Sequence, residues 1–185
     1  MGKPDGADRA GERFGRYELR EFVGRGGMGT VYRAFDTHLQ REVALKFPHF
    51  AAVTEPATLE RFVREARTAA GLRQRHICPV YDAGEIDGQL SIAMAFIEGA
   101  PLDRGIADGR PAPRAGAELI CKLAEALEAI HDAGVIHRDV KPGNVLIDRQ
   151  GEPVLTDFGL ARPVEGAERL TSSGSLLGIP AYMPP

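Results

Sequence analysis

Four polar residues stand close together in the last third of the 185-residue sequence: Asp139, Lys141, Asn144 and Asp157. Carboxylate and amide oxygens can bind Mg²⁺, and a carboxylate can also accept a proton. Two short apolar runs, 145–147 and 154–155, lie between these residues and flank a polar turn, which predicts a β-hairpin with functional groups at both ends. Taken singly, a turn aspartate, a surface lysine and a capping asparagine explain the same residues without any chemistry.

Together, the order and spacing resemble the H-R-D-x-K-x-x-N and D-F-G motifs of eukaryotic-type protein kinases, here from His137 to Asn144 and from Asp157 to Gly159. The Lys-Pro-Gly-Asn sequence at 141–144 resembles that of serine/threonine rather than tyrosine kinases. Within this class, the chain resembles the bacterial, Hanks-type branch. The resemblance implies an α+β, two-lobed fold with an antiparallel β N-lobe, one key helix and a partly present helical C-lobe. It also implies transfer of the γ-phosphoryl group of Mg-ATP to a protein serine or threonine hydroxyl.

The resemblance assigns a role to each of these residues. Asp139 accepts or orients the proton of the substrate hydroxyl, and Lys141 steadies the γ-phosphate. Asn144 and Asp157 hold Mg²⁺. His137 is interpreted as a structural brace rather than a general base, because the motif gives the base role to the aspartate.

The resemblance also implies regulatory residues. Arg138 would pair with a phosphorylated residue of the activation segment, and Phe158 would pack between the lobes and orient Asp157. Segment 163–178 resembles an activation loop, although a long mobile loop explains its composition equally well. Its candidate phosphorylation sites are Thr171, Ser172, Ser173 and Ser175.

A glycine-rich stretch at 24–29 interrupts two strand-like runs, 17–23 and 30–35. In a dinucleotide-binding fold such glycines open a helix whose N-terminus binds phosphate. Here β-branched and aromatic residues follow, which favours a second strand and a hairpin whose backbone amides close over phosphates. A turn with spare glycines remains an open alternative.

Lys46 stands within the next apolar strand, 42–47, where a lysine would ordinarily extend its ammonium to the surface. Its position resembles the kinase V-A-I-K lysine, which holds the α- and β-phosphates. Apolar residues at three- and four-residue spacing predict a helix over 58–73. Glu65, at the edge of its apolar stripe, pairs either with an arginine of the same helix or, as the resemblance implies, with Lys46 as part of the catalytic set.

Two further strands are predicted at 77–83 and 89–97, and the second leads into the connector between the lobes. By resemblance, Met94 is the gatekeeper and the backbone of 95–97 hydrogen-bonds adenine. The expected ATP-binding residues are Val23, Gly24, Arg25, Gly26, Gly27, Met28, Gly29, Thr30, Val31, Ala44, Lys46, Met94, Ala95 and Ile97.

A second amphipathic helix is predicted at 116–133, with Ile120, Leu123, Ala124, Leu127 and Ile130 on one face. The resemblance covers residues 16–185, about the first two-thirds of a kinase domain. The expected organisation is a flexible tail at 1–15, an N-lobe with hinge at 16–98 and a partial C-lobe at 99–185. Without the rest of the C-lobe, this helix face should be partly exposed and available for self-association.

The C-terminal motif departs from the family pattern. Ile179 replaces a threonine whose hydroxyl would bond to Asp139 and Lys141, and Pro184 replaces an alanine. An alternative function is therefore a non-catalytic kinase-like fragment that binds nucleotide or a partner protein. A broken gene product without a role is a third interpretation.

The composition and motifs of the chain give no support for several other classes of protein. The net charge of −3 gives no reason to expect nucleic acid or an anionic membrane as the main partner. No transmembrane segment, signal peptide or myristoylation site is recognised. Cys78 and Cys121 show no metal-ligand spacing and are expected as reduced thiols in a cytoplasmic protein.

Overall fold

The computed structural model describes residues 9–26, 29–49, 56–109 and 111–157, and leaves out the side chains of 56–59, 61, 62 and 65. These residues fall into two compact units. The first comprises the described residues up to Gly71 together with Pro79–Ile97. The second comprises Leu72–Cys78 and the described residues from Glu98 onwards.

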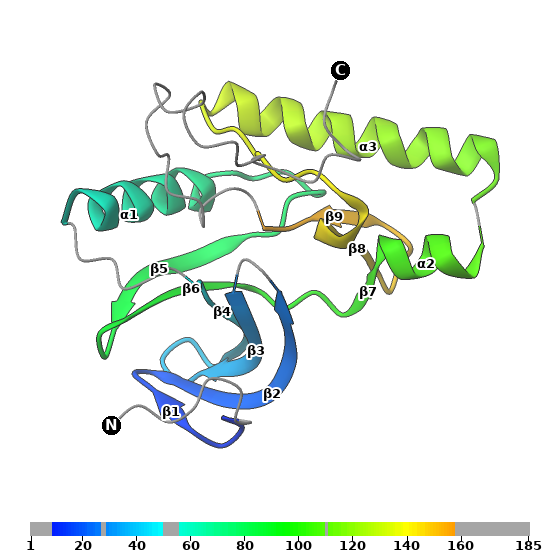
Figure 1. Cartoon of the computed structure of the whole chain (residues 1–185). Coiled ribbons are helices and arrows are strands. Elements are labelled where there is room, and N and C mark those ends of the chain that lie inside the picture. The colour runs from blue at the N-terminus through cyan, green and yellow to red at the C-terminus, as the bar shows by residue number, and fades with distance from the viewer. Residues whose placement is uncertain (1–8, 27–28, 50–55, 110, 158–185) are drawn as a thin grey trace, which may run out of the picture. The chain divides into compact units, whose positions relative to one another are not determined.

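An antiparallel sheet forms most of the first unit (Figure 1). Among the described residues it has six strands, in the order β1-β2-β3-β4-β6-β5, and every neighbouring pair is antiparallel. The strands are β1 (Arg13–Phe14), β2 (Tyr17–Gly26), β3 (Gly29–Asp36), β4 (Arg41–Phe47), β5 (Val80–Ile86) and β6 (Gln89–Ala95). The structure thus confirms the expected antiparallel N-lobe.

One hydrophobic core cluster of this unit lies on one face of the sheet, because alternate strand residues point to the same side. Tyr32 and Ala34 of β3 are 4% and 0% exposed, and Val43 and Leu45 of β4 are both 0% exposed. Phe14 of β1 joins this core at 3% exposure and packs edge-on against another core ring. Residues 13 and 14 were expected within a flexible tail, but β1 pairs with β2 and buries Phe14.

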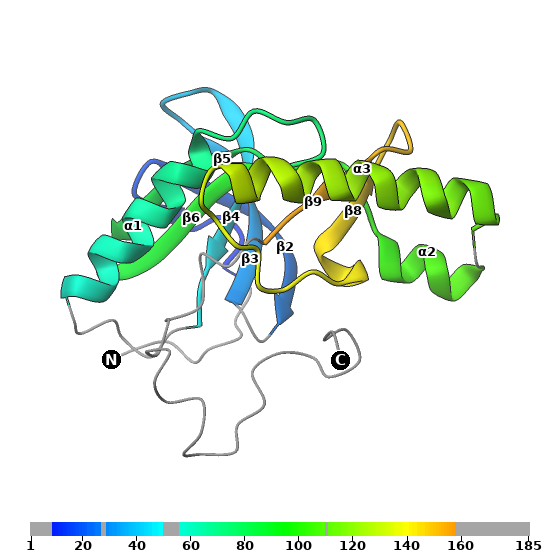
Figure 2. The ribbon, with the colours of Figure 1, turned by 90° about the horizontal axis from the view of Figure 1, so that it is seen from above.

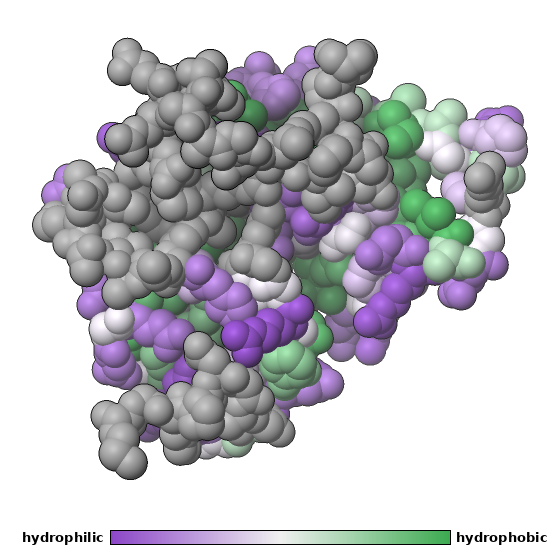
Figure 3. Space-filling model, in the orientation of Figure 1, coloured by the Kyte–Doolittle hydropathy of each residue, from purple (hydrophilic) through white to green (hydrophobic). Residues whose placement is uncertain are grey.

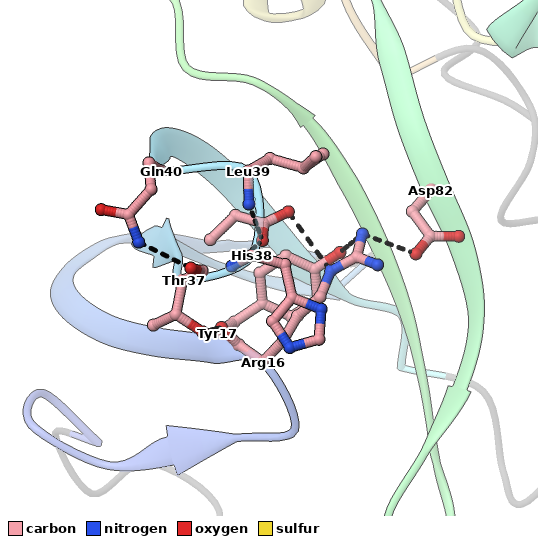
Figure 4. Close-up of polar contacts among 8 residues, drawn as sticks. Arg16, Tyr17, Thr37, His38, Leu39, Gln40 and Asp82 are labelled. Atoms are coloured by element: carbon pink, nitrogen blue, oxygen red, sulfur yellow. Dashed lines mark hydrogen bonds and ion pairs between the residues drawn. The ribbon is translucent and has the colours of Figure 1, made fainter.

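A polar cluster fastens the turn between β3 and β4 to the strands beside it (Figure 4). Buried Asp36 accepts hydrogen bonds from the amides of His38 and Leu39 at 3.0 and 3.1 Å, and lies 3.2 Å from Nε of Arg16. The same guanidinium donates to the hydroxyl of Tyr17 at 2.7 Å and to Asp82 of β5 at 2.9 Å. Burial raises the pKa of Tyr17 to about 12.

Helix α1 (Pro56–Ala70) packs against β5 through Ala66 and Ala69, which are 3% and 1% exposed. It ends three residues before the predicted boundary, where the amide of Gly71 donates to the carbonyl of Thr68.

The second unit contains β7 (Gly99–Pro101), α2 (Leu102–Asp108), α3 (Pro113–Asp132), the 3₁₀ turn η1 (Pro142–Asn144), β8 (Val145–Asp148) and β9 (Pro153–Leu155). Strands β7, β8 and β9 form an antiparallel sheet in that order, and β8 with β9 is the predicted hairpin. Helix α3 lies alongside β9 (Figures 1 and 2).

Helix α3 buries a slightly different face from the predicted one. Leu123, Ala126 and Ile130 are buried, whereas Ala124 is exposed. Ile120 is 63% exposed, whereas Leu123 is only 7% exposed. Hydrophobic and hydrophilic residues are mixed over the surface formed by α2 and α3 (Figure 3).

The segment Leu72–Cys78 packs with the second unit although it lies within the range predicted as N-lobe. Ile77 forms a parallel bridge with Leu155 of β9. The amide of Leu155 donates to the carbonyl of His76 at 2.8 Å, and the amide of Cys78 donates to the carbonyl of Leu155 at 2.9 Å. Strand β5 therefore begins at Val80 rather than at residue 77.

Buried Cys78 and exposed Cys121 are not joined by a disulfide. Within the described ranges, no helix combines the length and apolar character needed to cross a bilayer.

Candidate active site

In the first unit, the glycine-rich stretch forms a hairpin between β2 and β3, with Gly26 opposite Gly29 and Gly24 opposite Val31. A strand follows the glycines, so the dinucleotide-fold alternative, which needs a helix there, is wrong. Gly29 has φ 146°, and a Cβ at this position would collide with the carbonyl oxygen of Phe47. Glycine is therefore required at this position for close backbone approach.

Four of the predicted ATP-binding residues share one face of the sheet. Val31 lies opposite Lys46 in the β3–β4 ladder, and Ala44 lies opposite Met94 in the β4–β6 ladder. Directly opposed residues point to the same side, as do residues two apart in one strand. Lys46 is only 3% exposed, so its side chain does not extend to the surface. The sheet thus presents a buried ammonium beside small and apolar side chains.

The remaining predicted nucleotide contacts lie in the same unit. Val23 is 53% exposed, Arg25 and Gly26 are exposed, and the hydroxyl of Thr30 lies 2.8 Å from Nε2 of His49. The Ala95 amide donates to the carbonyl of Pro79 at 2.9 Å, so this N–H is used within the unit, and Ile97 is half-buried. Gly27 and Met28 lie outside the described residues.

Glu65 lies in α1, but its side chain is not among those described. The ion pair of Glu65 with Lys46 therefore stays a prediction.

In the second unit, the loop after α3 brings together two of the predicted catalytic residues, Asp139 and Lys141, and one predicted metal ligand, Asn144. Asp139 is 6% exposed, and its Oδ2 lies 2.7 Å from Nζ of Lys141. The side-chain amide of Asn144 donates to the same Oδ2 at 2.7 Å and to the carbonyl oxygen of Asp139 at 2.8 Å. A buried carboxylate is thus held by an ammonium and an amide, which satisfies the need of a buried charge for partners.

Asn144 also connects this loop to the residue before Asp157. Its backbone carbonyl accepts hydrogen bonds from the amide and the hydroxyl of Thr156, at 2.8 and 3.1 Å. Asp157 has φ 59° and Arg138 has φ 63°. Non-glycine residues adopt this left-handed backbone at a cost and only where the surrounding structure enforces it. The surrounding structure must therefore hold the backbone of Arg138 and Asp157 in this conformation.

The donor set fits Mg²⁺ through hard oxygen ligands. Because Nδ2 of Asn144 donates to Asp139, the Asn144 oxygen Oδ1 is the side-chain atom suited to bind a cation. Asp157 follows Thr156, whose amide and hydroxyl bond to the Asn144 carbonyl, and its carboxylate is also a ligand type that Mg²⁺ prefers. No group of three or more His, Cys, Asp or Glu side chains forms a metal site in the described part of the chain. Mg²⁺ commonly shares its ligand shell with phosphate and water, so two protein ligands suffice.

His137 is 1% exposed and uses both ring nitrogens. Its Nε2 lies 3.0 Å from the carbonyl oxygen of Thr156, and the amide of Asp139 donates to Nδ1 at 3.3 Å. A carbonyl only accepts, so Nε2 carries the proton and Nδ1 accepts. Burial lowers the pKa of His137, which favours this neutral form. The contacts support the interpretation of His137 as a brace.

The other predicted regulatory residues are only partly located. The Arg138 side chain is exposed. Phe158, Thr171, Ser172, Ser173 and Ser175, and the substituted Ile179, lie outside the described residues. Sequence reasoning missed Thr156, whose only signal is a hydroxyl residue directly before Asp157 at the end of an apolar run.

Comparisons with known proteins identify the family of this chain. The protein kinase domain family matches residues 17–185. The chain is 43% identical to the serine/threonine-protein kinases PknE, over 178 residues, and PknH, over 179 residues, of Mycobacterium tuberculosis; each match covers 96% of this chain. It spans 31% of PknE and 28% of PknH, less than a third of either relative.

Among solved structures, the kinase domain of M. tuberculosis PknI is similar with a TM-score of 0.73 at 34% identity, covering 84% of this chain and 62% of that one. The apo form of PpkA-294 is similar with a TM-score of 0.67 at 28% identity, covering 85% of this chain and 63% of that one. The chain belongs to the protein kinase family.

Proposed function

We propose that this chain carries the ATP-handling part of a serine/threonine protein kinase, which transfers the γ-phosphoryl group of Mg-ATP to a hydroxyl of a protein substrate. The observation that carries the proposal is the buried cluster of Asp139, Lys141 and Asn144. PknE and PknH are named serine/threonine-protein kinases, which favours an enzyme over the alternative of a non-catalytic binding fragment.

On the nucleotide side, residues of the first unit would bind and orient ATP. The amides of the hairpin at Gly24 to Gly29 would approach the phosphates, since glycines place no side chain in the way. The ammonium of Lys46 would attract the α- and β-phosphates, with Glu65 as its proposed partner. Val31, together with Ala44 and Met94 on the same sheet face, would contact the adenine.

On the acceptor side, the second unit would position the attacking hydroxyl. Asp139 would accept a hydrogen bond from the substrate hydroxyl and take its proton as the new P–O bond forms and the bond from the γ-phosphorus to the leaving ADP breaks. Lys141 would stabilise negative charge on the transferred group. Asn144 and Asp157 would hold Mg²⁺, which when bound neutralises charge on the phosphates. Most of the rate enhancement in such a reaction comes from position and electrostatics, which a rigid buried cluster supplies.

Intact-mass measurement of the purified chain after incubation with Mg-ATP tests this proposal, with Asp139→Asn as the matched control. The amide has the same shape as the carboxylate but cannot take the proton. We expect phosphate addition to the wild-type chain only, mapped by fragmentation to Thr171, Ser172, Ser173 or Ser175. A folded wild-type sample that binds Mg-ADP but transfers no phosphate to itself or to a generic protein substrate would favour the binding fragment instead.

A further inference from the structure

Glu152, in the turn between β8 and β9, gathers basic side chains from two other parts of the second unit. Nζ of Lys122, on α3, lies 2.7 Å from Oε2 of Glu152. From the segment Leu72–Cys78, a guanidinium nitrogen of Arg75 lies 3.7 Å from Oε1 and Nδ1 of His76 lies 4.0 Å from Oε2. The hydrogen bond from Lys122 is the main cause that lowers the pKa of Glu152. One carboxylate thus contacts α3 and the 72–78 segment.

Backbone hydrogen bonds at Glu152 close the β8–β9 hairpin. The amide of Glu152 donates to Oδ1 of Asp148 at 2.9 Å, and the amide of Asp148 donates to the carbonyl of Glu152 at 3.0 Å. The carbonyl of the next residue, Pro153, lies 2.8 Å from Nδ1 of His76, which must therefore carry a proton. The side chain of buried His76 therefore binds the start of β9, at Pro153. The backbone hydrogen bonds of Leu155 with His76 and Cys78 bind its end.

Strand β9 continues directly into the candidate active site. Thr156 donates through both its amide and its hydroxyl to the carbonyl of Asn144, and its own carbonyl accepts from Nε2 of His137. Asp157 follows Thr156 with a left-handed backbone. A shift of β9 along its axis would therefore move the proposed metal ligands, Asn144 and Asp157, relative to Asp139.

From these contacts we propose that Glu152 is a positioning residue: by bridging Lys122 to the 72–78 segment it holds β9 in place, and so sets Asn144 and Asp157 for Mg²⁺ and nucleotide. The last part of this proposal, the effect on Mg²⁺ and nucleotide binding, rests on the function proposed above. The side chains of Glu152 and Lys122 are 21% and 37% exposed, and ion pairs this exposed add little to global stability. The effect should therefore appear in local order and metal affinity, with the free energy of unfolding nearly unchanged.

The test compares Glu152→Gln and Lys122→Met with two controls in the full 185-residue chain. Lys122→Arg keeps the cation, and Glu128→Gln removes an exposed carboxylate of the same helix. Amide hydrogen exchange is followed at Asn144, Leu155 and Thr156, whose N–H groups all donate in this network. We expect exchange at these amides to accelerate roughly threefold to tenfold in the two disrupting variants and in neither control.

The second readout is the Mg²⁺ concentration needed for half-maximal binding of ADP, which we expect to rise several-fold in the same two variants, since partners behind a metal ligand tune its affinity. The double variant should resemble Glu152→Gln alone, because Lys122→Met removes an ion pair that the loss of the Glu152 charge has already removed. Unchanged exchange at Thr156 in both disrupting variants would overturn the proposal, as would acceleration spread evenly over the chain. Failure of the wild type to bind Mg-ADP would count against the proposed function, and the exchange data would still decide whether Glu152 holds β9.

Discussion

Replacement of Asn144 by alanine should destabilise the second unit even when no nucleotide is present. The Asn144 side chain is 6% exposed and makes two hydrogen bonds to Asp139, one to a carbonyl and one to the carboxylate. A neutral hydrogen bond contributes about 1 kcal/mol and one to a charged group about 1.5–3 kcal/mol. Lys141 still contacts the same carboxylate oxygen in the variant, and the Thr156 bonds use the Asn144 backbone. Because this remaining contact offsets part of the lost hydrogen bonding, we expect the free energy of unfolding to decrease by about 2–3 kcal/mol.

Urea denaturation at pH 7 without Mg²⁺ measures this loss as a lower transition midpoint at constant m-value. Val140→Ala is the matched control, because Val140 lies in the same loop with 43% of its side chain exposed. Its stability should stay within about 0.5 kcal/mol of the wild type. A loss below about 1 kcal/mol for Asn144→Ala would refute the view that its amide is what satisfies the buried carboxylate.

Three further predictions concern protonation and backbone geometry. Burial lowers the pKa of His137, so the stabilisation that its neutral form provides is complete above about pH 6.5 and is lost as the pH falls through the lowered pKa. Between pH 7 and pH 5 the urea midpoint should therefore fall less in His137→Gln than in the wild type. Gly29→Ala places a methyl group against the carbonyl of Phe47 and should lower the free energy of unfolding by about 2 kcal/mol or more. Gly24→Ala has open space around the new methyl group and should change the free energy of unfolding little. Differential scanning fluorimetry, which compares the two melting temperatures, would show whether the variants differ. The pKa of Tyr17 is raised to about 12, so Tyr17 ionises first in the unfolded state and the stability of the fold decreases as the pH rises above about 10. Tyr17→Phe should lack this decrease in alkaline titrations followed by circular dichroism. The same pH dependence in both proteins would contradict this prediction.

The strands could be predicted because their residue types follow the geometry of a half-buried sheet. Tyr32 and Ala34 alternate with Val31 and Arg33, and the first pair is buried in the structure. Helix α2 could not be predicted in this way. It is seven residues long and has no buried residue, so no apolar stripe marks it in the sequence.

Long-range pairing explains the other differences. Phe14 stands in a polar stretch that reads as a tail, and only its pairing partner in β2 makes it a core residue. Ile77 looks like the start of the following strand, yet its backbone pairs with Leu155, some eighty residues further along the chain. Such contacts depend on which segments meet in the fold, and neither periodicity nor composition carries that information.

The sequence identifies the polar side chains of the site, but their hydrogen bonds decide how each is used. Asn144 has an N–H₂ group and an oxygen at the ends of one planar amide, and the N–H₂ group is directed to Asp139. An aspartate at this position would have the same shape but would bring a second carboxylate against a buried one, and like charges that close oppose ionisation of either. The asparagine amide can satisfy the carboxylate of Asp139 with its N–H₂ group and leave its oxygen for a cation. We therefore expect the neighbouring charge of Asp139 to favour asparagine at position 144 as much as the proposed metal does.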